Sequence, residues 1–367
     1  MLRTVKQSQL YTPYSYFMSE TSVKDQVCDY GALLRAAHKC KRGVMWKDSV
    51  AGWMKNSLTN CFLLKDEICS GKYKIGKYSV FEITEPKKRT IVSTHFKDRV
   101  FQRSLCDNYL TNALSRSFIY DNAACQVGKG TDFARKRLKV HLQKFYRKHE
   151  LNGYVFKCDI KNYFGSTPHS VAIEAVSAKL DDEWAAGEVA RIINSFTQGP
   201  DPDVGLGLGS QVTQLIELTV LDHLDHIIKE QLHIKHYVRY MDDFILIHES
   251  KEYLRYCMAV IEAELRRLGL QLSAKKTQIF PVKQSIRFLG FSYRLTGTGK
   301  VVMKVLSKKV TKARRRLKKQ VALCKAGVMS REQVDDCFRS WKAHAVKGDS
   351  YMLIRSTKDY YNKLWEE

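Results

Sequence analysis

The 367-residue sequence has few acidic residues, few prolines and no long apolar run. Its 38 Asp and Glu residues stand against 62 Lys and Arg residues, a formal net charge of +24. Six prolines and 20 glycines exclude collagen-like and low-complexity organisation. No apolar stretch reaches the roughly 18–20 residues that cross a bilayer, and the first residues lack an export signal. We therefore expect a cytoplasmic protein without a membrane partner, and the positive charge favours a nucleic acid as the partner.

Cysteine occurs ten times but never in the spacing Cys-x-x-Cys. A structural zinc site needs paired short spacings, and a secreted disulfide scaffold is shorter and denser in cysteine. The cysteine pattern therefore disfavours both a structural zinc site and a disulfide scaffold.

The 44% hydrophobic and 11% aromatic content excludes a disordered polyelectrolyte. The chain is long enough for one large domain or for two to three smaller ones with buried cores.

The hydrophobic periodicity predicts an α+β fold of mixed helices and antiparallel strands. Helical spacing covers residues 31–75, 100–114, 210–228 and 250–268. Short β-rich runs cover residues 78–92, 154–159 and several segments before Leu295. Two further β-rich runs, His236–Tyr240 and Phe244–His248, are separated only by Met241-Asp242-Asp243, which predicts a hairpin with acidic residues at its tip.

The segment from Lys300 to Lys325 contains 11 Lys or Arg residues and no acidic residue. Apolar residues interleave with the basic ones at roughly helical spacing. A solvated helix usually relieves like-charge repulsion with i,i+4 ion pairs, so we favour a helix that follows phosphates over a merely solvated one. The predicted nucleic-acid contacts are Lys308, Lys309, Lys312, Arg314, Arg315, Arg316, Lys318 and Lys319.

Three aspartates form the candidate catalytic group. Asp159 ends the run Tyr154–Asp159, and Asp242 and Asp243 occupy the hairpin tip. An Asp-Asp turn alone is weak evidence, because Asp favours turns. A strand-terminal Asp beside a hairpin tip, in a strongly basic chain, matches what two-metal nucleotidyl transfer needs: carboxylates that hold two divalent cations roughly 3.5–4 Å apart.

Two motifs carry a resemblance to reverse transcriptases. Tyr240-Met241-Asp242-Asp243 resembles their Y-x-D-D motif, and the segment from Asp159 to Phe164 resembles their D-x-x-x-x-[FY] motif. The resemblance implies a right-hand polymerase with fingers, palm and thumb that copies RNA into DNA. It implies that Asp159, Asp242 and Asp243, with the backbone carbonyl of Ile160, coordinate two Mg²⁺ ions, for which Mn²⁺ could substitute. Phe164 would collide with a 2′-hydroxyl and so select deoxynucleotides.

Four further segments resemble motifs of the same family in the same order. Residues 87–91 resemble K-P-R-x-I, which implies that Lys87 and Arg89 grip the incoming triphosphate. The glycine-rich residues 205–210 resemble motif B, with Leu208 beside the incoming nucleotide, where an aliphatic side chain suggests looser base selection. Lys276 lies in a motif D-like segment and would assist the leaving pyrophosphate. Residues 288–290 resemble the primer grip F-L-G.

Three stretches are similar to the bacterial and phage reverse transcriptases of diversity-generating retroelements and to the unclassified, antiphage group. They are residues 96–100, 124–131 and 340–345. Gln126 stands where the diversity-generating enzymes usually have Arg, and residues 207–214 also depart from their pattern. Sequence diversification and antiphage defence therefore both stay open as roles.

The implied organisation has four parts. They are an N-terminal helical extension over residues 1–75, fingers over 76–150, a palm over 151–295 with interleaved fingers elements, and a helical, basic thumb over 296–367. The implied partners are deoxynucleoside triphosphates, a primer–template duplex and a template RNA, expected to be a structured noncoding RNA encoded nearby. An accessory protein or a homo-oligomer stays open.

Two alternatives remain. An RNA-templated RNA polymerase is disfavoured by Phe164 and by the Tyr-Met-Asp-Asp tip. A catalytically idle RNA-binding scaffold with a palm fold is disfavoured because three clustered carboxylates cost stability unless metals compensate them. Asp222 and Asp225 match no family motif, and we interpret them as solvated helix acids.

Overall fold

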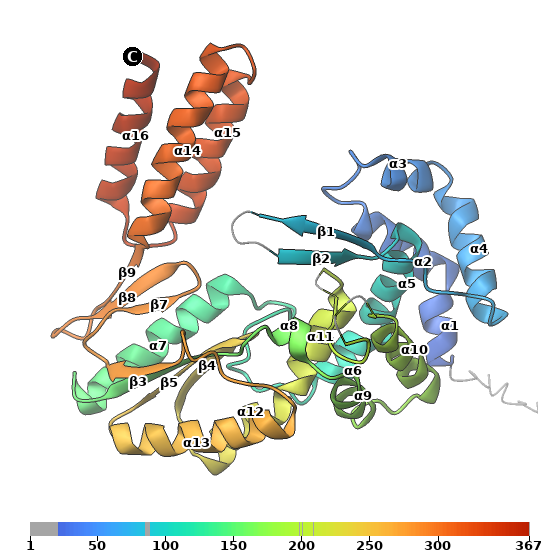
Figure 1. The fold of residues 1–367 in the computed structure, drawn as a ribbon, viewed down its shortest axis with the longest axis horizontal. Coiled ribbons are helices and arrows are strands. Elements are labelled where there is room, and N and C mark those ends of the chain that lie inside the picture. Colours follow the sequence, from blue (N-terminus) through green and yellow to red (C-terminus); the bar gives the residue numbers. More distant parts are fainter. Residues whose placement is uncertain (1–20, 85–88, 198, 200, 208, 367) are drawn as a thin grey trace, which may run out of the picture.

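The computed structural model describes residues 21–84, 89–197, 199, 201–207 and 209–366. Helices dominate, and three antiparallel sheets lie among them, so the predicted α+β class is confirmed (Figure 1). None of the described helices is long and apolar enough to cross a membrane.

The N-terminal part is a cluster of helices. The predicted helical stretch over residues 31–75 is divided into three helices, α2 to α4, and one short helix precedes them. Side-chain caps begin the first two helices, since Ser22 accepts from the Asp25 N–H and Asp29 from the Ala32 N–H. The bounds are α1 (Val23–Cys28), α2 (Tyr30–Cys40), α3 (Asp48–Lys55) and α4 (Ser57–Cys69).

A two-stranded hairpin and a broken helix follow this cluster. The hairpin pairs β1 (Ser79–Ile83) with β2 (Arg89–Ser93). The helix predicted near residues 100–114 is interrupted by a π-helical turn, and its first part packs on α2 (Figure 1). Its parts are α5 (Phe96–Leu105), η1 (Cys106–Leu110) and α6 (Thr111–Ser115).

The central sheet has the strand order β4-β5-β3-β6, with every pair antiparallel. Successive side chains of a strand point to opposite faces. Val155 and Ile245 therefore share a core with helix α7 (Thr131–His149), whereas Phe156 and Phe244 share the other core with helix α13 (Lys251–Arg267). The strands are β3 (Tyr154–Asp159), β4 (His236–Tyr240), β5 (Asp243–His248) and β6 (Gln278–Pro281).

A second group of helices packs beside this sheet on the side of α5 (Figure 1). Ser210 caps α11 as predicted, because its side chain accepts a hydrogen bond from the Val212 N–H. The single long helix predicted after Ser210 is divided into three pieces. The group comprises α8 (Tyr163–Ser166), α9 (His169–Ser177), α10 (Glu183–Asn194), α11 (Gln211–Val220), α12 (Asp222–His226) and the π-helical turn η2 (Ile227–Gln231).

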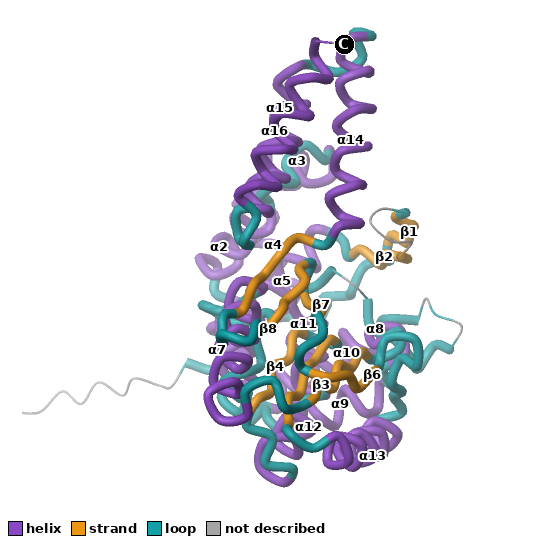
Figure 2. Tube along the Cα trace, turned by 90° about the vertical axis from the view of Figure 1, so that its left-hand side faces the viewer, coloured by secondary structure: helices purple, strands orange, loops and turns teal. Residues whose placement is uncertain are grey.

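The C-terminal part is a small sheet followed by a bundle of three helices that projects from the body (Figure 2). The basic segment predicted as a helix from Lys300 begins as a strand, because its β-branched residues 301, 302 and 305 lie in the strand that pairs with β8. The strands are β7 (Ile286–Phe288), β8 (Phe291–Leu295) and β9 (Val301–Val305), and the helices are α14 (Ser307–Lys325), α15 (Arg331–Ala345) and α16 (Tyr351–Glu366).

Candidate active site

The predicted catalytic aspartates lie at one end of the central sheet. In the pairing of β3 with β5, Asp159 stands directly opposite Asp243. Tyr240 pairs with Asp243, so the hairpin turn consists of only two residues, Met241 and Asp242. Met241 has a φ of 56°, which two-residue hairpin turns require but side-chain-bearing residues rarely adopt. The backbone of Met241 is therefore strained, and contacts around the turn must hold it in this conformation.

A buried arginine supports the strained turn from below. Arg239 Nη1 donates to the Met241 carbonyl at 3.2 Å, and Nη2 donates to the Leu218 carbonyl at 3.3 Å. Its Nε and Nη2 also donate to the two carboxylate oxygens of Asp225 at 2.8 and 2.5 Å. Tyr237 Oη donates to the same carboxylate at 2.6 Å. All the donors of this network lie in β4, so the strand that leads into the turn is locked to α12.

The interpretation of Asp222 and Asp225 as solvated acids is wrong. Both are buried, with exposed fractions of 1% and 0%. Asp225 balances Arg239, whose side chain is also completely buried, and Asp222 accepts from Lys179 Nζ at 2.6 Å. A buried charge must be paired, so the one arginine inside the β-rich run His236–Tyr240 was the available signal for a buried acid elsewhere.

Two lysines compensate the aspartates. Lys157 Nζ lies 2.5 Å from Asp243 Oδ1, and Lys276 Nζ lies 2.5 Å from Asp159 Oδ1. Burial raises the pKa of Asp243 to about 6, and the negative charges of Asp159 and Asp242 add to this rise, while Lys157 opposes it. The negative charges of the three aspartates thus act on one another, and the two lysines offset part of this repulsion.

The backbone at Ile160 joins the aspartate group. The Ile160 N–H donates to the Asp242 carbonyl at 3.3 Å, and the Asp159 carbonyl accepts from the Ser273 N–H at 2.7 Å. In the part of the chain that the structure describes, no group of three or more His, Cys, Asp or Glu side chains is arranged to hold a metal ion. Of the predicted ligands, the paired Asp159 and Asp243 and the Ile160 carbonyl form a smaller set than such a group. Their hard oxygen atoms are of the kind that fits Mg²⁺.

Phe164 and the glycine-rich loop form one unit next to the aspartates. The Leu206 N–H donates to the Phe164 carbonyl at 2.6 Å, and the Gly205 N–H donates to the Thr167 carbonyl at 2.9 Å. Gly205 has a φ of 103°, and a Cβ there would lie 3.4 Å from the Gly165 carbonyl oxygen. The positive φ, rather than lack of space, therefore favours glycine at this position. Leu208 lies outside the described residues.

Glu217 lies beneath this unit, and nothing in the sequence singled it out. It is fully buried in α11, and its carboxyl oxygens lie 3.1 and 3.2 Å from Thr167 Oγ1. Burial raises the pKa of Glu217 to about 8, although hydrogen bonds from Tyr163 and Thr167 oppose the rise. A buried carboxyl near the aspartates thus holds Thr167, the residue to which the glycine-rich loop is bonded.

The predicted triphosphate contacts are only partly described. Lys87 lies outside the described residues. Arg89 opens β2 opposite Ile83, and its side chain is likewise outside the description.

The predicted primer-grip segment is a tight turn between β7 and β8. Leu289 and Gly290 both have positive φ, at 45° and 88°. Arg135 of α7 donates to the Leu289 carbonyl at 3.2 Å, and the His344 ring packs on Phe291 with centroids 4.7 Å apart. His344 belongs to the segment 340–345, which therefore packs beside this turn, and Arg135 of α7 holds the same turn.

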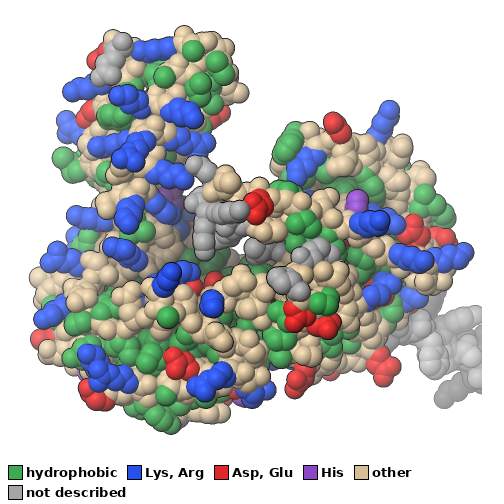
Figure 3. All heavy atoms as spheres, viewed as in Figure 1, with side chains coloured by type: hydrophobic (Ala, Val, Ile, Leu, Met, Phe, Trp, Pro, Cys, Tyr) green, Lys and Arg blue, Asp and Glu red, His purple; other side chains and the backbone are tan. Residues whose placement is uncertain are grey.

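Most of the predicted nucleic-acid contacts on α14 are exposed. Arg314 differs, because it donates to Ser356 Oγ at 2.9 Å and to Thr357 Oγ1 at 3.1 Å and lies over the Tyr360 ring. It joins α14 to α16 inside the bundle. Figure 3 shows Lys and Arg side chains along the bundle, beside the hollow that separates it from the N-terminal half of the molecule.

A protein-family model agrees with these motifs. The family model described as "Reverse transcriptase (RNA-dependent DNA polymerase)" matches residues 81–322. No curated protein matches the sequence. A solved structure of apo telomerase from Candida tropicalis, truncated from its C-terminal domain, is similar with a TM-score of 0.45 and 14% identity, over 67% of this chain and 60% of that one. This chain thus covers less than two thirds of that relative.

The segment matched by the family model takes up more than half of the chain. It runs from β1 into α14 and contains Asp159, Asp242 and Asp243. The chain therefore belongs to the reverse transcriptase family.

Proposed function

We propose that this protein is an RNA-directed DNA polymerase that adds deoxynucleotides to a primer on an RNA template. The observation that carries the proposal is the facing pair Asp159 and Asp243, with Asp242 in the turn beside them. The family generally uses divalent metal ions, and the oxygen atoms of these neighbouring carboxylates are of the kind that such ions prefer.

Asp159, Asp242, Asp243 and the Ile160 carbonyl would hold two Mg²⁺ ions, with Mn²⁺ as a substitute. When bound, the ions activate the primer 3′-hydroxyl and stabilise the leaving pyrophosphate. Lys276, which neutralises Asp159 in this structure, would then be released toward the pyrophosphate, where it can supply charge or a proton. Lys157 would keep Asp243 ionised.

Selection of the nucleotide is proposed to rest on residues near these aspartates. The Phe164 ring would exclude a 2′-hydroxyl, and the hydrogen bond from the Leu206 N–H to the Phe164 carbonyl ties the backbone that carries this ring to the glycine-rich loop. Lys87 and Arg89 would bind the triphosphate. Leu208 would lie against the base pair that the incoming nucleotide forms with the template.

The proposed organisation has fingers, a palm and a thumb, with a boundary after residue 295 that divides the β7–β9 sheet. The hairpin of β1 and β2 belongs to the fingers (76–150), the central sheet to the palm (151–295) and the helical bundle to the thumb (296–367), with the helices before residue 76 as an extension. The exposed cations of α14 would follow the template–primer duplex. These are Lys308, Lys309, Lys312, Arg315, Arg316, Lys318 and Lys319, with Arg314 serving the bundle itself.

The biological role is proposed to be antiphage defence or sequence diversification by a retroelement. The support is the likeness of residues 96–100, 124–131 and 340–345 to those bacterial and phage enzymes. The template would be a structured noncoding RNA encoded nearby, and an accessory protein or a second copy of the chain could complete the assembly.

A primer-extension assay tests the activity. The purified protein, alone and with RNA from its native neighbourhood, is supplied with Mg²⁺ or Mn²⁺ and with deoxynucleotides or ribonucleotides. We expect DNA from deoxynucleotides only, and no product from the Asp242→Asn/Asp243→Asn variant although that variant still binds RNA. Synthesis from ribonucleotides alone would indicate an RNA polymerase.

The absence of product from every preparation of the parent would favour the idle scaffold. Sequencing of the DNA separates the two biological roles. Template-copied DNA with errors opposite adenine indicates diversification, whereas repetitive or untemplated DNA made only with the native RNA indicates defence.

A further inference from the structure

Helix α7 has a strongly basic surface that the aspartate site does not use. Its 19 residues, Thr131–His149, contain seven Lys or Arg residues and one acidic residue, Asp132. One side of the helix is buried against the central sheet and the β7–β9 sheet. The buried residues are Ala134, Arg135, Leu138, His141, Leu142 and Phe145.

The opposite side carries five cations, which we call the α7 basic face: Lys136, Lys139, Lys144, Arg147 and Lys148. At 100° per residue these five positions lie on one half of the helix. Among the described residues, no carboxylate pairs with any of them. The other two cations differ, because Arg135 pairs with Asp132 and Arg137 with Asp121 at 2.5 and 2.6 Å. Two of the seven cations of α7 are thus neutralised by a carboxylate, and the five of the α7 basic face have no such partner among the described residues.

The α7 basic face extends away from the aspartates. The C-terminal end of α7 lies beside the far end of β5, where His149 Nε2 is 3.8 Å from the Glu249 carboxylate. Asp243 begins β5 and His248 ends it, so Arg147 and Lys148 are roughly 17 Å from the catalytic end of the sheet. This end of the α7 basic face therefore lies at the opposite end of the sheet from the aspartates.

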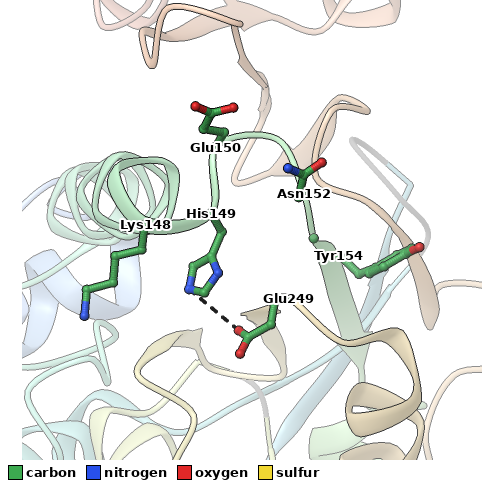
Figure 4. A pocket seen from close by; sticks show the side chains of 7 residues that line it. Lys148, His149, Glu150, Asn152, Tyr154 and Glu249 are labelled. Carbon is green, nitrogen blue, oxygen red and sulfur yellow. Dashed lines mark ion pairs between the residues drawn. The ribbon is translucent and has the colours of Figure 1, made fainter.

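The acidic residues at this end do not neutralise the face. Glu249 and Glu150 line a pocket of about 640 Å³ together with His149 and Lys148. Figure 4 shows that His149 points toward Glu249, whereas the Lys148 side chain leaves the helix in another direction, away from both glutamates. Glu249 therefore pairs with the histidine, and Glu150 points away from the Lys148 side chain.

An aromatic side chain lies near the other end of the helix. Tyr120 is 64% exposed, and the Arg137 guanidinium and Lys129 ammonium lie 4.9 and 5.4 Å from its ring centroid. Arg137 is bonded to Asp121 and Lys129 to the backbone carbonyls of residues 119, 120 and 122, so these cations fix the ring in place. An exposed ring held in this way is suited to stacking on an unpaired base.

We propose that the α7 basic face and Tyr120 bind a structured RNA outside the polymerase cleft, as a second RNA contact. The inference rests on the proposed function insofar as RNA is the partner. A membrane surface fits less well, because the apolar side of α7 is already used in the core and the exposed side has no apolar stripe to insert. The ring and the cations together fit stacked bases and phosphates better than an acidic protein.

The test compares two triple charge reversals of equal size. One is Lys136→Glu/Lys144→Glu/Arg147→Glu on the α7 basic face. The control is Lys55→Glu/Lys65→Glu/Lys72→Glu, three cations of the N-terminal part that likewise have no ion pair among the described residues. Binding to a labelled stem-loop RNA without a primer is measured over a series of salt concentrations. Extension of a short preformed RNA–DNA primer–template is measured in parallel.

We expect the α7 variant to bind the stem-loop RNA at least about tenfold more weakly than the control variant, with a salt slope smaller by about two. Tyr120→Ala should weaken binding without changing the slope. Extension of the short duplex should be unchanged. Equal RNA affinity of the two triple variants would overturn the proposal, as would binding of the parent to phosphatidylserine vesicles but not to the RNA. A parent that binds RNA but makes no DNA would contradict the polymerase function alone.

Discussion

At the scale of single residues, the buried charges carry the most structural information. Arg239 and Asp225 are both fully buried and are joined by two hydrogen bonds. The remaining Nη1 donor of Arg239 supports the Met241 carbonyl inside the strained turn. The ion pair therefore couples the packing of β4 to the backbone position of Asp242.

Removing one partner of this pair should be strongly destabilising. Arg239→Met leaves the Asp225 carboxylate buried without its cation, and we expect a loss of about 3–5 kcal/mol in the free energy of unfolding. The double variant Arg239→Met/Asp225→Leu removes both charges and should recover much of that loss. Urea unfolding of the two variants measures the difference. A single variant as stable as the parent would show that the pair is not essential.

Glu217 gives the protein a pH-dependent stability. Its pKa rises from 4.5 to about 8 because the carboxyl is fully buried. The folded chain therefore binds a proton between pH 4.5 and 8 that the unfolded chain has released, so stability falls as pH rises through this window, by up to about 1.4 kcal/mol per pH unit. Glu217→Gln should remove this contribution. Unfolding of parent and variant at pH 5.5 and 7.5 checks it, and identical pH slopes would contradict it.

At the scale of elements, the glycine-rich loop is held by the backbone of the segment that follows Asp159. Gly205 donates to the Thr167 carbonyl with a φ of 103°, close to Gly165. Helix α11 then begins at the Ser210 cap. The loop, the Phe164 segment and the start of α11 are thus expected to move as one unit.

A matched pair of glycine substitutions tests this coupling. Gly205→Ala forces an alanine into positive φ, and we expect a loss of about 1–2 kcal/mol in stability together with slower nucleotide addition. Gly187→Ala is the control, since Gly187 is inside α10 with no atom near its Cβ position, and should stabilise by up to about 1 kcal/mol. Thermal unfolding and single-nucleotide extension are the measurements. Normal extension by Gly205→Ala would show that the loop is not coupled to the site.

At the scale of the whole molecule, two helices carry surfaces rich in positive charge. One is the exposed side of α14 on the projecting bundle (Figure 1), and the other is the α7 basic face. Mutations should separate the functions of the two surfaces. Only the bundle lies beside the hollow of Figure 3, where a primer–template duplex would enter.

Charge reversal on α14 should therefore affect both binding and synthesis. Arg315→Glu/Arg316→Glu/Lys319→Glu is expected to weaken binding to a primer–template about tenfold or more, to reduce the salt slope by about two, and to lower extension of the same short duplex. Binding isotherms over a salt series and steady-state extension measure the two effects. An unchanged salt slope would remove α14 from the nucleic-acid surface.

The sequence by itself predicted the α+β class, the hairpin with Asp242 and Asp243, the strand that ends in Asp159 and the Ser210 cap, because local spacing and periodicity encode these features. Only the tertiary structure showed that Asp222 and Asp225 are buried, that Arg314 joins two helices and that Lys157 and Lys276 neutralise the aspartates. Only the structure also revealed which cations of α7 point outward. The partners of the paired residues lie on other elements, often far along the chain. A charge becomes buried, and so needs a partner, only after these elements have packed together.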